Sequence, residues 1–261
     1  MTSFVDFVDL LGTSVQYTLK SQGARFWLGV GGGAAVGGIC WAVGSASGRL
    51  WNRRFHTKPL HHVLLFTAAL ITVVFAVIYC SADYMASASK DRVAIWSVKL
   101  KNNSAWASES FAEAWERVKR AGIEDFSGHP SPRDNPDTTI PIGQSESKKI
   151  VASVYAGAAM RNFQRENSFI GSFVHANLEV PEAALNEDVY EFFRSNPDSK
   201  SYPIERGIDL VVTLLKRDIE IQIPAIAQYS ERMVIILLFA VQLLVFLVLA
   251  IVAYRSLTAT R

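Results

Sequence analysis

The feature that most constrains this chain is a long apolar segment close to its end. Residues 233–254 contain no charged side chain and one polar side chain, Gln242. A helix of this length spans roughly 33 Å, which is enough to cross the hydrocarbon core of a bilayer. The segment is longer and more uniformly apolar than a helix in a soluble core. We therefore expect a transmembrane helix at 232–254.

Two earlier segments also lack charge almost completely. Residues 63–84 are apolar apart from small polar side chains such as Thr67 and Thr72, which can hydrogen-bond to their own helix backbone. Residues 26–47 are rich in glycine. Charged residues make up 19% of the chain, below the usual quarter of a globular protein. The pattern predicts three transmembrane helices and excludes a fully soluble enzyme and a secreted domain.

Positive charges near the ends of these helices predict the orientation. The loop 48–62 contains four bases and no acid, and the tail 255–261 contains two bases and no acid. Loops rich in lysine and arginine remain in the cytoplasm, so we expect the N-terminus and residues 85–231 outside it. The expected location is the inner membrane of a bacterium. The bases of the loop, which could also contact anionic lipid headgroups, are Arg49, Arg53, Arg54 and Lys58.

The segment 85–231 is long enough to form an extracytoplasmic domain with its own core. Hydrophobic periodicity and helix-end signals predict a mostly helical fold. The expected helices are 109–121, 146–166, 181–193 and 205–221. Ser108 or Ser110 would cap the first, and Tyr155 would face inward on the second. The last would lead into the third span across a bend near Pro224. Residues 92–101 fit a helix or a strand, 127–143 a surface loop, and 173–180 a short strand. The segment 83–232 contains 22 acidic and 18 basic side chains, so we expect no nucleic-acid partner.

The N-terminal segment 1–25 is predicted to contain an amphipathic helix over 2–20. The apolar residues that recur at helical spacing include Phe4, Phe7, Val8 and Leu11. The polar face contains acids rather than the lysines and arginines that membrane-surface helices usually carry. Docking onto a partner subunit and packing against the chain's own spans both remain open.

The first span has the sharpest pattern in the chain. Gly29, Gly33 and Gly37 are spaced by four residues, and Gly44 and Gly48 repeat this spacing. Glycines at this interval share one face of a helix and allow another helix backbone to approach closely. The pattern predicts a helix-packing surface, either between chains, self-association included, or within one chain.

No combination of residues indicates catalysis. The sequence lacks nucleophile-elbow, zinc-protease and phosphate-loop motifs, and we expect no enzyme activity, cofactor or metal. The loop 127–143, which contains four prolines and is called the proline-rich loop below, includes His129, Asp134 and Asp137. We interpret these three residues as solvated side chains. Cys40 and Cys80 lie at opposite ends of their spans, too far apart for a disulfide bond.

These observations favour a non-enzymatic membrane subunit or scaffold. Its expected partners are the lipid bilayer and other membrane subunits, in a secretion, conjugation or similar envelope assembly. The alternative is an extracytoplasmic sensing or ligand-binding module that signals through a partner protein. A channel or transporter is disfavoured because the spans contain no ionisable residue in their interiors. A polar pocket in the domain would favour sensing, and an exposed apolar patch would favour assembly.

Overall fold

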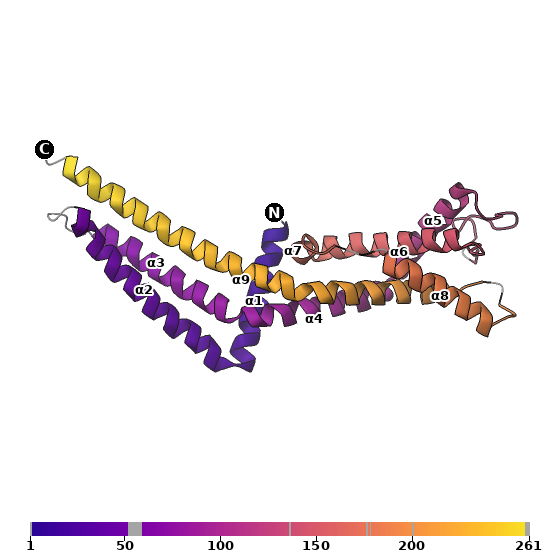
Figure 1. Cartoon of the computed structure of the whole chain (residues 1–261), viewed down its shortest axis with the longest axis horizontal. Helices are drawn as coiled ribbons and strands as arrows, with labels where there is room; N and C mark the ends of the chain where they lie inside the picture. Colours follow the sequence, from indigo (N-terminus) through magenta and orange to yellow (C-terminus); the bar gives the residue numbers. More distant parts are fainter. Residues whose placement is uncertain are drawn as a thin grey trace. The chain divides into compact units, whose positions relative to one another are not determined.

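The computed structural model describes residues 2–51, 59–135, 137–175, 177, 179–199 and 201–258, and within them the chain is mostly helical with no strand (Figure 1). The helices are α1 (Thr2–Ser21), α2 (Gly23–Trp51), α3 (Pro59–Cys80), α4 (Ala82–Lys101), α5 (Ser104–Ala121), α6 (Ser145–Glu166), α7 (Ser168–Gly171), α8 (Glu179–Ser195) and α9 (Ile204–Thr258). The expectation of a mainly helical protein is confirmed.

The chain divides into two compact units. The helical domain comprises Met1–Asp6 and Ser89–Pro224, and the span unit comprises Phe7–Ala88 and Ala225–Arg261. The boundaries fall within α1, α4 and α9, so three helices contribute residues to both units.

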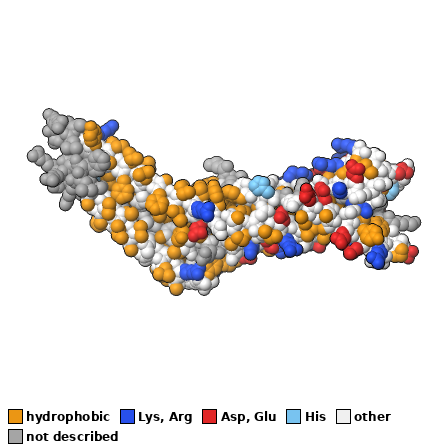
Figure 2. Space-filling model, in the orientation of Figure 1, with side chains coloured by type: hydrophobic (Ala, Val, Ile, Leu, Met, Phe, Trp, Pro, Cys, Tyr) orange, Lys and Arg blue, Asp and Glu red, His pale blue; other side chains and the backbone are white. Residues whose placement is uncertain are grey.

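The span unit contains three helices that are long and apolar enough to cross a membrane. They are Gly23–Ala46 in α2, His61–Cys80 in α3, and the apolar part of α9. Most of their side chains are exposed, and Figure 2 shows a surface dominated by hydrophobic side chains over these helices. Such a surface is unstable in water and suits contact with lipid. The chain is thus a multi-pass membrane protein.

Helix α3 ends just before Ser81. The backbone N–H of Ser81 donates to the carbonyls of Val77 and Ile78, and its hydroxyl donates to the carbonyl of Val77 at 2.8 Å. A serine that bonds back onto the preceding turn competes with the regular helical pattern. Helix α4 then begins at Ala82. Residues 92–101, for which the sequence left a helix or a strand open, belong to helix α4.

The helical domain buries a large apolar core. Among its fully buried side chains are Trp115, Phe163, Ile170, Leu185 and Leu215, which come from α5, α6, α7, α8 and α9. Each contributes roughly 1.5–3 kcal/mol through removal of apolar surface from water. This core holds five helices together and fixes the segments that connect them.

A buried polar side chain pairs with the indole donor of Trp96 in this core. The Trp96 indole on α4 packs edge-to-face on Phe163, with 5.0 Å between ring centroids. Its Nε1 donates to Oδ1 of Asn162 at 2.9 Å. The indole of Trp96 is therefore buried with its N–H donor hydrogen-bonded.

The ends of α5 follow from local sequence. The N-cap is Asn103, whose side chain accepts from the backbone N–H of Trp106, rather than the expected Ser108 or Ser110. An N-cap side chain satisfies one of the free N–H groups of the first turn, and Asn is among the best residues for this role. Gly122 ends the helix at φ 65°, a left-handed conformation that glycine adopts without steric cost, as expected.

The prediction of a strand at 173–180 is wrong, because the described residues of this segment form no strand. The backbone N–H and carbonyl of His175 both bond to the side-chain amide of Gln222 on α9, at 3.0 and 2.9 Å. A strand needs a neighbouring backbone to pair with, and this side chain takes that place. Glu179 then begins α8, with Pro181 in the first turn as expected.

The last helix runs without interruption through Pro224. Proline lacks the N–H of an interior helical bond and usually kinks a helix. The boundary between the two units falls at this residue. The bend expected near Pro224 stays a prediction.

Candidate functional site

The glycines of the first span lie against α3 in the same chain. A Cβ at Gly29 would lie 3.0 Å from Cα of Val77, and one at Gly33 would lie 2.7 Å from Cα of Val73. Helix backbones approach this closely only where one of them carries no side chain. Gly29 and Gly33 therefore form part of a packing surface within the span unit.

Two further glycines extend this surface. A Cβ at Gly37 would lie 2.8 Å from the carbonyl oxygen of Ala69, and one at Gly44 would overlap the side chain of Leu65. The surroundings of Gly48 lie outside what the structure describes. The packing surface thus follows one face of α2 over four helical turns.

The opposite face of α2 is also smooth, but it is exposed. At 100° per residue, its small residues fall within about 60° of one another, on the side away from the α3 contact. They are Gly31, Ala35, Gly38 and Ala42, all exposed in the single chain. A Cβ at Gly31 or Gly38 would meet no atom within 4 Å. We call these residues the open face of α2.

A polar contact joins α9 to α3 inside the span unit. Gln242, only 9% exposed, donates to Oγ1 of Thr72 at 2.5 Å and to the carbonyl oxygen of Ala68 at 3.2 Å. An unpaired amide is costly in a hydrocarbon environment. The contact therefore fixes the position of α9 on α3.

The structure describes α1 but not the side chains of the basic loop 48–62 that were expected to contact lipid. Arg53, Arg54 and Lys58 lie outside the described residues, as does the side chain of Arg49, so their contact with lipid stays a prediction. On α1, Phe4 is 70% and Val8 50% exposed.

A different side of α1 from the one that carries Phe4 and Val8 is buried. Phe7 and Leu11 are half-buried, whereas Leu10 and the small polar residues Ser14 and Thr18 are fully buried. The two hydroxyls donate to the carbonyls four residues earlier, so their burial leaves no free donor.

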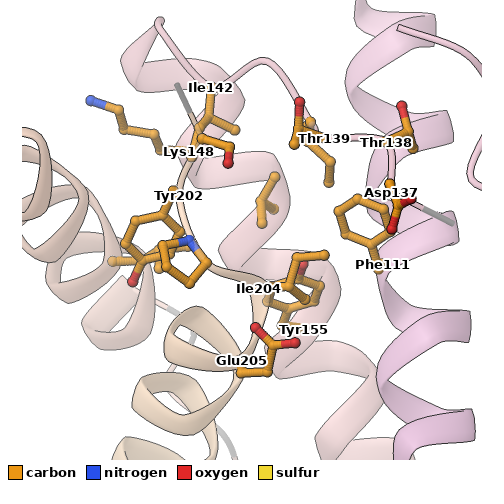
Figure 3. A pocket seen from close by; sticks show the side chains of 15 residues that line it. Phe111, Asp137, Thr138, Thr139, Ile142, Lys148, Tyr155, Tyr202, Ile204 and Glu205 are labelled. Atoms are coloured by element: carbon orange, nitrogen blue, oxygen red, sulfur yellow. The ribbon is translucent and has the colours of Figure 1, made fainter. Parts of the chain in front are cut away.

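A cleft lies in the helical domain between the proline-rich loop and helices α5, α6, α8 and α9 (Figure 3). It has an inner cavity of about 230 Å³ and an adjoining cavity of about 740 Å³, and the two share Thr139, Ile142, Lys148 and Tyr202 among their lining residues. The apolar wall of the inner cavity is formed by Phe111, Ile140, Val151, Leu185 and Ile204.

Tyr155 of α6 contributes a buried hydroxyl to the inner cavity. The side chain is 2% exposed, and no described residue forms a hydrogen bond with its hydroxyl. Burial, and secondarily the nearby carboxylate of Glu205, raises the pKa of Tyr155 well above its usual 10.0. The hydroxyl therefore remains protonated at physiological pH and can donate a hydrogen bond.

Charged side chains lie at separate edges of the inner cavity. Figure 3 shows Lys148 on one side, with its amino group directed away from the other labelled side chains, Asp137 on the opposite side near Phe111, and Glu205 beside Tyr155. The lining of the cavity thus contains one basic and two acidic side chains at separate places.

Tyr202 is held in the cleft wall by a three-residue network. Its hydroxyl donates to Oδ2 of Asp188 on α8, and Arg206 on α9 donates to both oxygens of the same carboxylate at 2.6 and 2.7 Å. Arg206 also stacks over Phe192, 5.5 Å from its ring centroid. The hydrogen bonds from Arg206 hold the pKa of Asp188 below its usual 3.8. The network ties α8 to the first turn of α9.

The cleft could not be located from the sequence. Lys148, Tyr155, Tyr202 and Glu205 belong to separate segments with no shared motif, and helical spacing gave Tyr155 only an inward position. His129 lies in the same loop, with its Nδ1 3.4 Å from Oγ1 of Thr139. Among the described residues no cluster of metal-ligating side chains is found.

The chain was compared with known families, curated proteins and solved structures, and none of them matches it.

Proposed function

We propose that this protein is a non-enzymatic subunit or scaffold of a larger membrane assembly. The observation that carries this proposal is the open face of α2. The inner glycine face packs on α3, whereas a Cβ at Gly31 or Gly38 on the open face would meet no described atom within 4 Å. Membrane helices associate through faces of small residues because close backbone approach replaces side-chain packing. A helix from another subunit, or from a second copy, would fit this face.

The exposed apolar residues of α1 support the same function. Phe4 and Val8 offer apolar surface beyond the three spans. This surface is suited to a partner subunit or to the acyl region of the bilayer. Neither role requires chemistry, which agrees with a structural subunit.

Substitutions on the two exposed sides of α2 test the assembly. Gly38→Leu adds bulk to the open face. Gly32→Leu makes the same change about 120° around the helix from Gly38, at a position where a Cβ also meets no atom within 4 Å. We expect Gly38→Leu to reduce the mass of the particle extracted in mild detergent and to remove its co-purifying subunits. Gly32→Leu should leave both unchanged. Light scattering coupled to size-exclusion chromatography, with mass spectrometry, measures the result. An unchanged particle for Gly38→Leu would refute the interface.

The proposed orientation places the helical domain outside the cytoplasm, in the bacterial inner membrane. It is supported by the four bases of the loop 48–62 and the two bases of the tail. Single cysteines at Ser108→Cys and Asn52→Cys, in a Cys40→Ala/Cys80→Ala background, report the two sides. We expect a membrane-impermeant maleimide to label only Ser108→Cys in intact spheroplasts. Labelling of Asn52→Cys alone would show that the topology is the reverse of the one proposed.

A second candidate function is ligand binding by the helical domain, with the signal passed to a partner. The observation in its favour is the cleft, where a buried tyrosine and charged side chains line a mostly apolar cavity. Pockets with this composition are typical of small-molecule sites. Thermal unfolding in the presence of candidate ligands tests it, because a ligand that binds the folded state raises the unfolding temperature.

A further inference from the structure

The side chain of Tyr155 lines the inner cavity, where its hydroxyl can form a hydrogen bond with a bound molecule. Buried polar groups in folded proteins are almost always hydrogen-bonded, and each exception costs free energy. The hydroxyl lies on the wall of a cavity, so a molecule in that cavity can accept its hydrogen bond. The protonated phenol can donate to an acceptor such as a carbonyl or carboxylate oxygen.

The apolar wall sets the second requirement. Side chains from α5, α6, α8, α9 and the proline-rich loop enclose the inner cavity, among them Phe111, Leu185 and Ile204. A fully polar ligand would lose its hydration against this wall without compensation. The cavity of about 230 Å³ is smaller than the pockets that bind drug-sized molecules. The occupant is therefore small and carries an apolar group.

The charges set the third requirement. Lys148 lies on one side of the cavity, Asp137 on the opposite side, and Glu205 beside Tyr155 (Figure 3). An anion alone would be repelled at the acidic edge, and a cation alone would be repelled at Lys148. A molecule that carries both charges is attracted at each edge, and hydrogen bonds to charged groups are the stronger ones.

We propose that the cleft binds a small zwitterion with an apolar side chain, the chemistry shared by a hydrophobic amino acid and a dipeptide. Lys148 binds its carboxylate, Glu205 binds its ammonium group, and Tyr155 donates to one of its oxygens. The adjoining cavity of about 740 Å³ leaves room for a second residue. This inference rests on the second candidate function, ligand binding, and is independent of the assembly role.

Calorimetric titration of the full-length protein in lipid nanodiscs tests the inference with four probes. They are L-leucine, L-leucyl-L-leucine, L-leucinamide, which lacks the carboxylate, and 4-methylpentanoate, which lacks the ammonium group. We expect leucine or dileucine to bind, and both single-charge analogues to bind at least about tenfold more weakly. The tighter of the two zwitterions shows whether the site takes a free amino acid or a peptide.

Variants assign the charges to residues. Lys148→Met should abolish the preference for leucine over leucinamide, and Glu205→Gln the preference over 4-methylpentanoate. Tyr155→Phe keeps the ring in the core and should weaken zwitterion binding about fivefold, with helical content unchanged. Lys149→Met, at the exposed neighbour of Lys148, is the matched control and should bind as the parent protein does.

The outcomes separate this inference from the function on which it rests. Equal or tighter binding of a single-charge analogue, weakened by Tyr155→Phe, would overturn the zwitterion and retain the cleft as a ligand site. Binding of leucine unaffected by all three cleft variants would overturn the assignment of the site. Absence of binding for all four probes would overturn the inference.

Discussion

The side-chain amide of Gln242 donates a hydrogen bond to Oγ1 of Thr72, and the two residues belong to different membrane helices. They are separated by 170 positions in the sequence. The amide also reaches the carbonyl oxygen of Ala68. Beside it, Leu65, Ala68, Val245 and Leu249 form an apolar cluster between the same two helices. The contact therefore combines a polar link with close apolar packing.

We predict that Gln242 and Thr72 are energetically coupled. Gln242→Leu and Thr72→Val should each destabilise the span unit, and the double variant should cost less than the sum of the two. Interhelical hydrogen bonds in membranes contribute about 0.6 kcal/mol on average and up to about 2 kcal/mol. A double-mutant cycle on the unfolding free energy in detergent measures the coupling. Thr67→Val is the control, because Thr67 is exposed and bonds only to its own helix at Val63. Strict additivity would contradict the prediction.

We predict that the inner and open faces of α2 respond oppositely to added methyl groups. Gly33→Ala places a Cβ 2.7 Å from Cα of Val73, so α2 and α3 must move apart. Overpacking of this kind costs about 1–3 kcal/mol. Gly31→Ala meets no neighbour and should stabilise α2 slightly through its higher helix propensity. Thermal unfolding of the two variants in the same detergent checks the difference, and equal unfolding temperatures would disprove it.

We predict that Asp188 makes the helical domain sensitive to acid. Its pKa is lower in the folded protein than its usual 3.8, so the carboxylate stabilises the fold above that value. This contribution is lost as the pH falls below 3.8 through the lower folded pKa. Asp188→Asn should reduce stability at pH 7 by about 2 kcal/mol and flatten the acid limb of the stability profile. Circular dichroism during urea unfolding at several pH values measures both effects. Exposed Asp198→Asn should change neither.

We predict that Asp6 fixes the N-terminal part of α1 to the rest of the helical domain. Its Oδ1 accepts from Arg92 at 2.6 Å, and its Oδ2 accepts from the backbone N–H of Phe169 at 2.8 Å. Asp6→Ala removes both acceptors and should raise amide exchange at Phe169 by about tenfold, which corresponds to roughly 1.4 kcal/mol. Asp6→Asn keeps one neutral acceptor and should have a smaller effect. Hydrogen exchange with mass spectrometry checks the order, and equal protection in both variants would exclude this role of Asp6.

Several features followed from the sequence because their causes are local. The absence of charge over about 20 residues defines a membrane helix wherever it occurs, and three such helices are present. Gly122 ends α5 because a left-handed residue is needed at that position. The periodic apolar residues of α5, α6 and α8 gave the right helices for the same reason.

Other features depended on residues that are distant in the sequence. The strand expected at 173–180 is absent because Gln222, nearly fifty residues further on, occupies the backbone groups of His175. Helix spacing could not distinguish which side of α2 contacts α3, because both sides are lined with small residues. Helix ends were also displaced where several cap residues competed, as at Asn103.

The sequence by itself determined that the chain crosses the membrane through three apolar helices and carries a mostly helical domain, since hydrophobicity and helical period are properties of consecutive residues. Tertiary structure alone decided that Gly33 meets Val73, that Gln242 meets Thr72, and that Tyr155, Lys148 and Glu205 line one cleft. These contacts join separate helices, and their geometry depends on how the helices pack rather than on any local pattern.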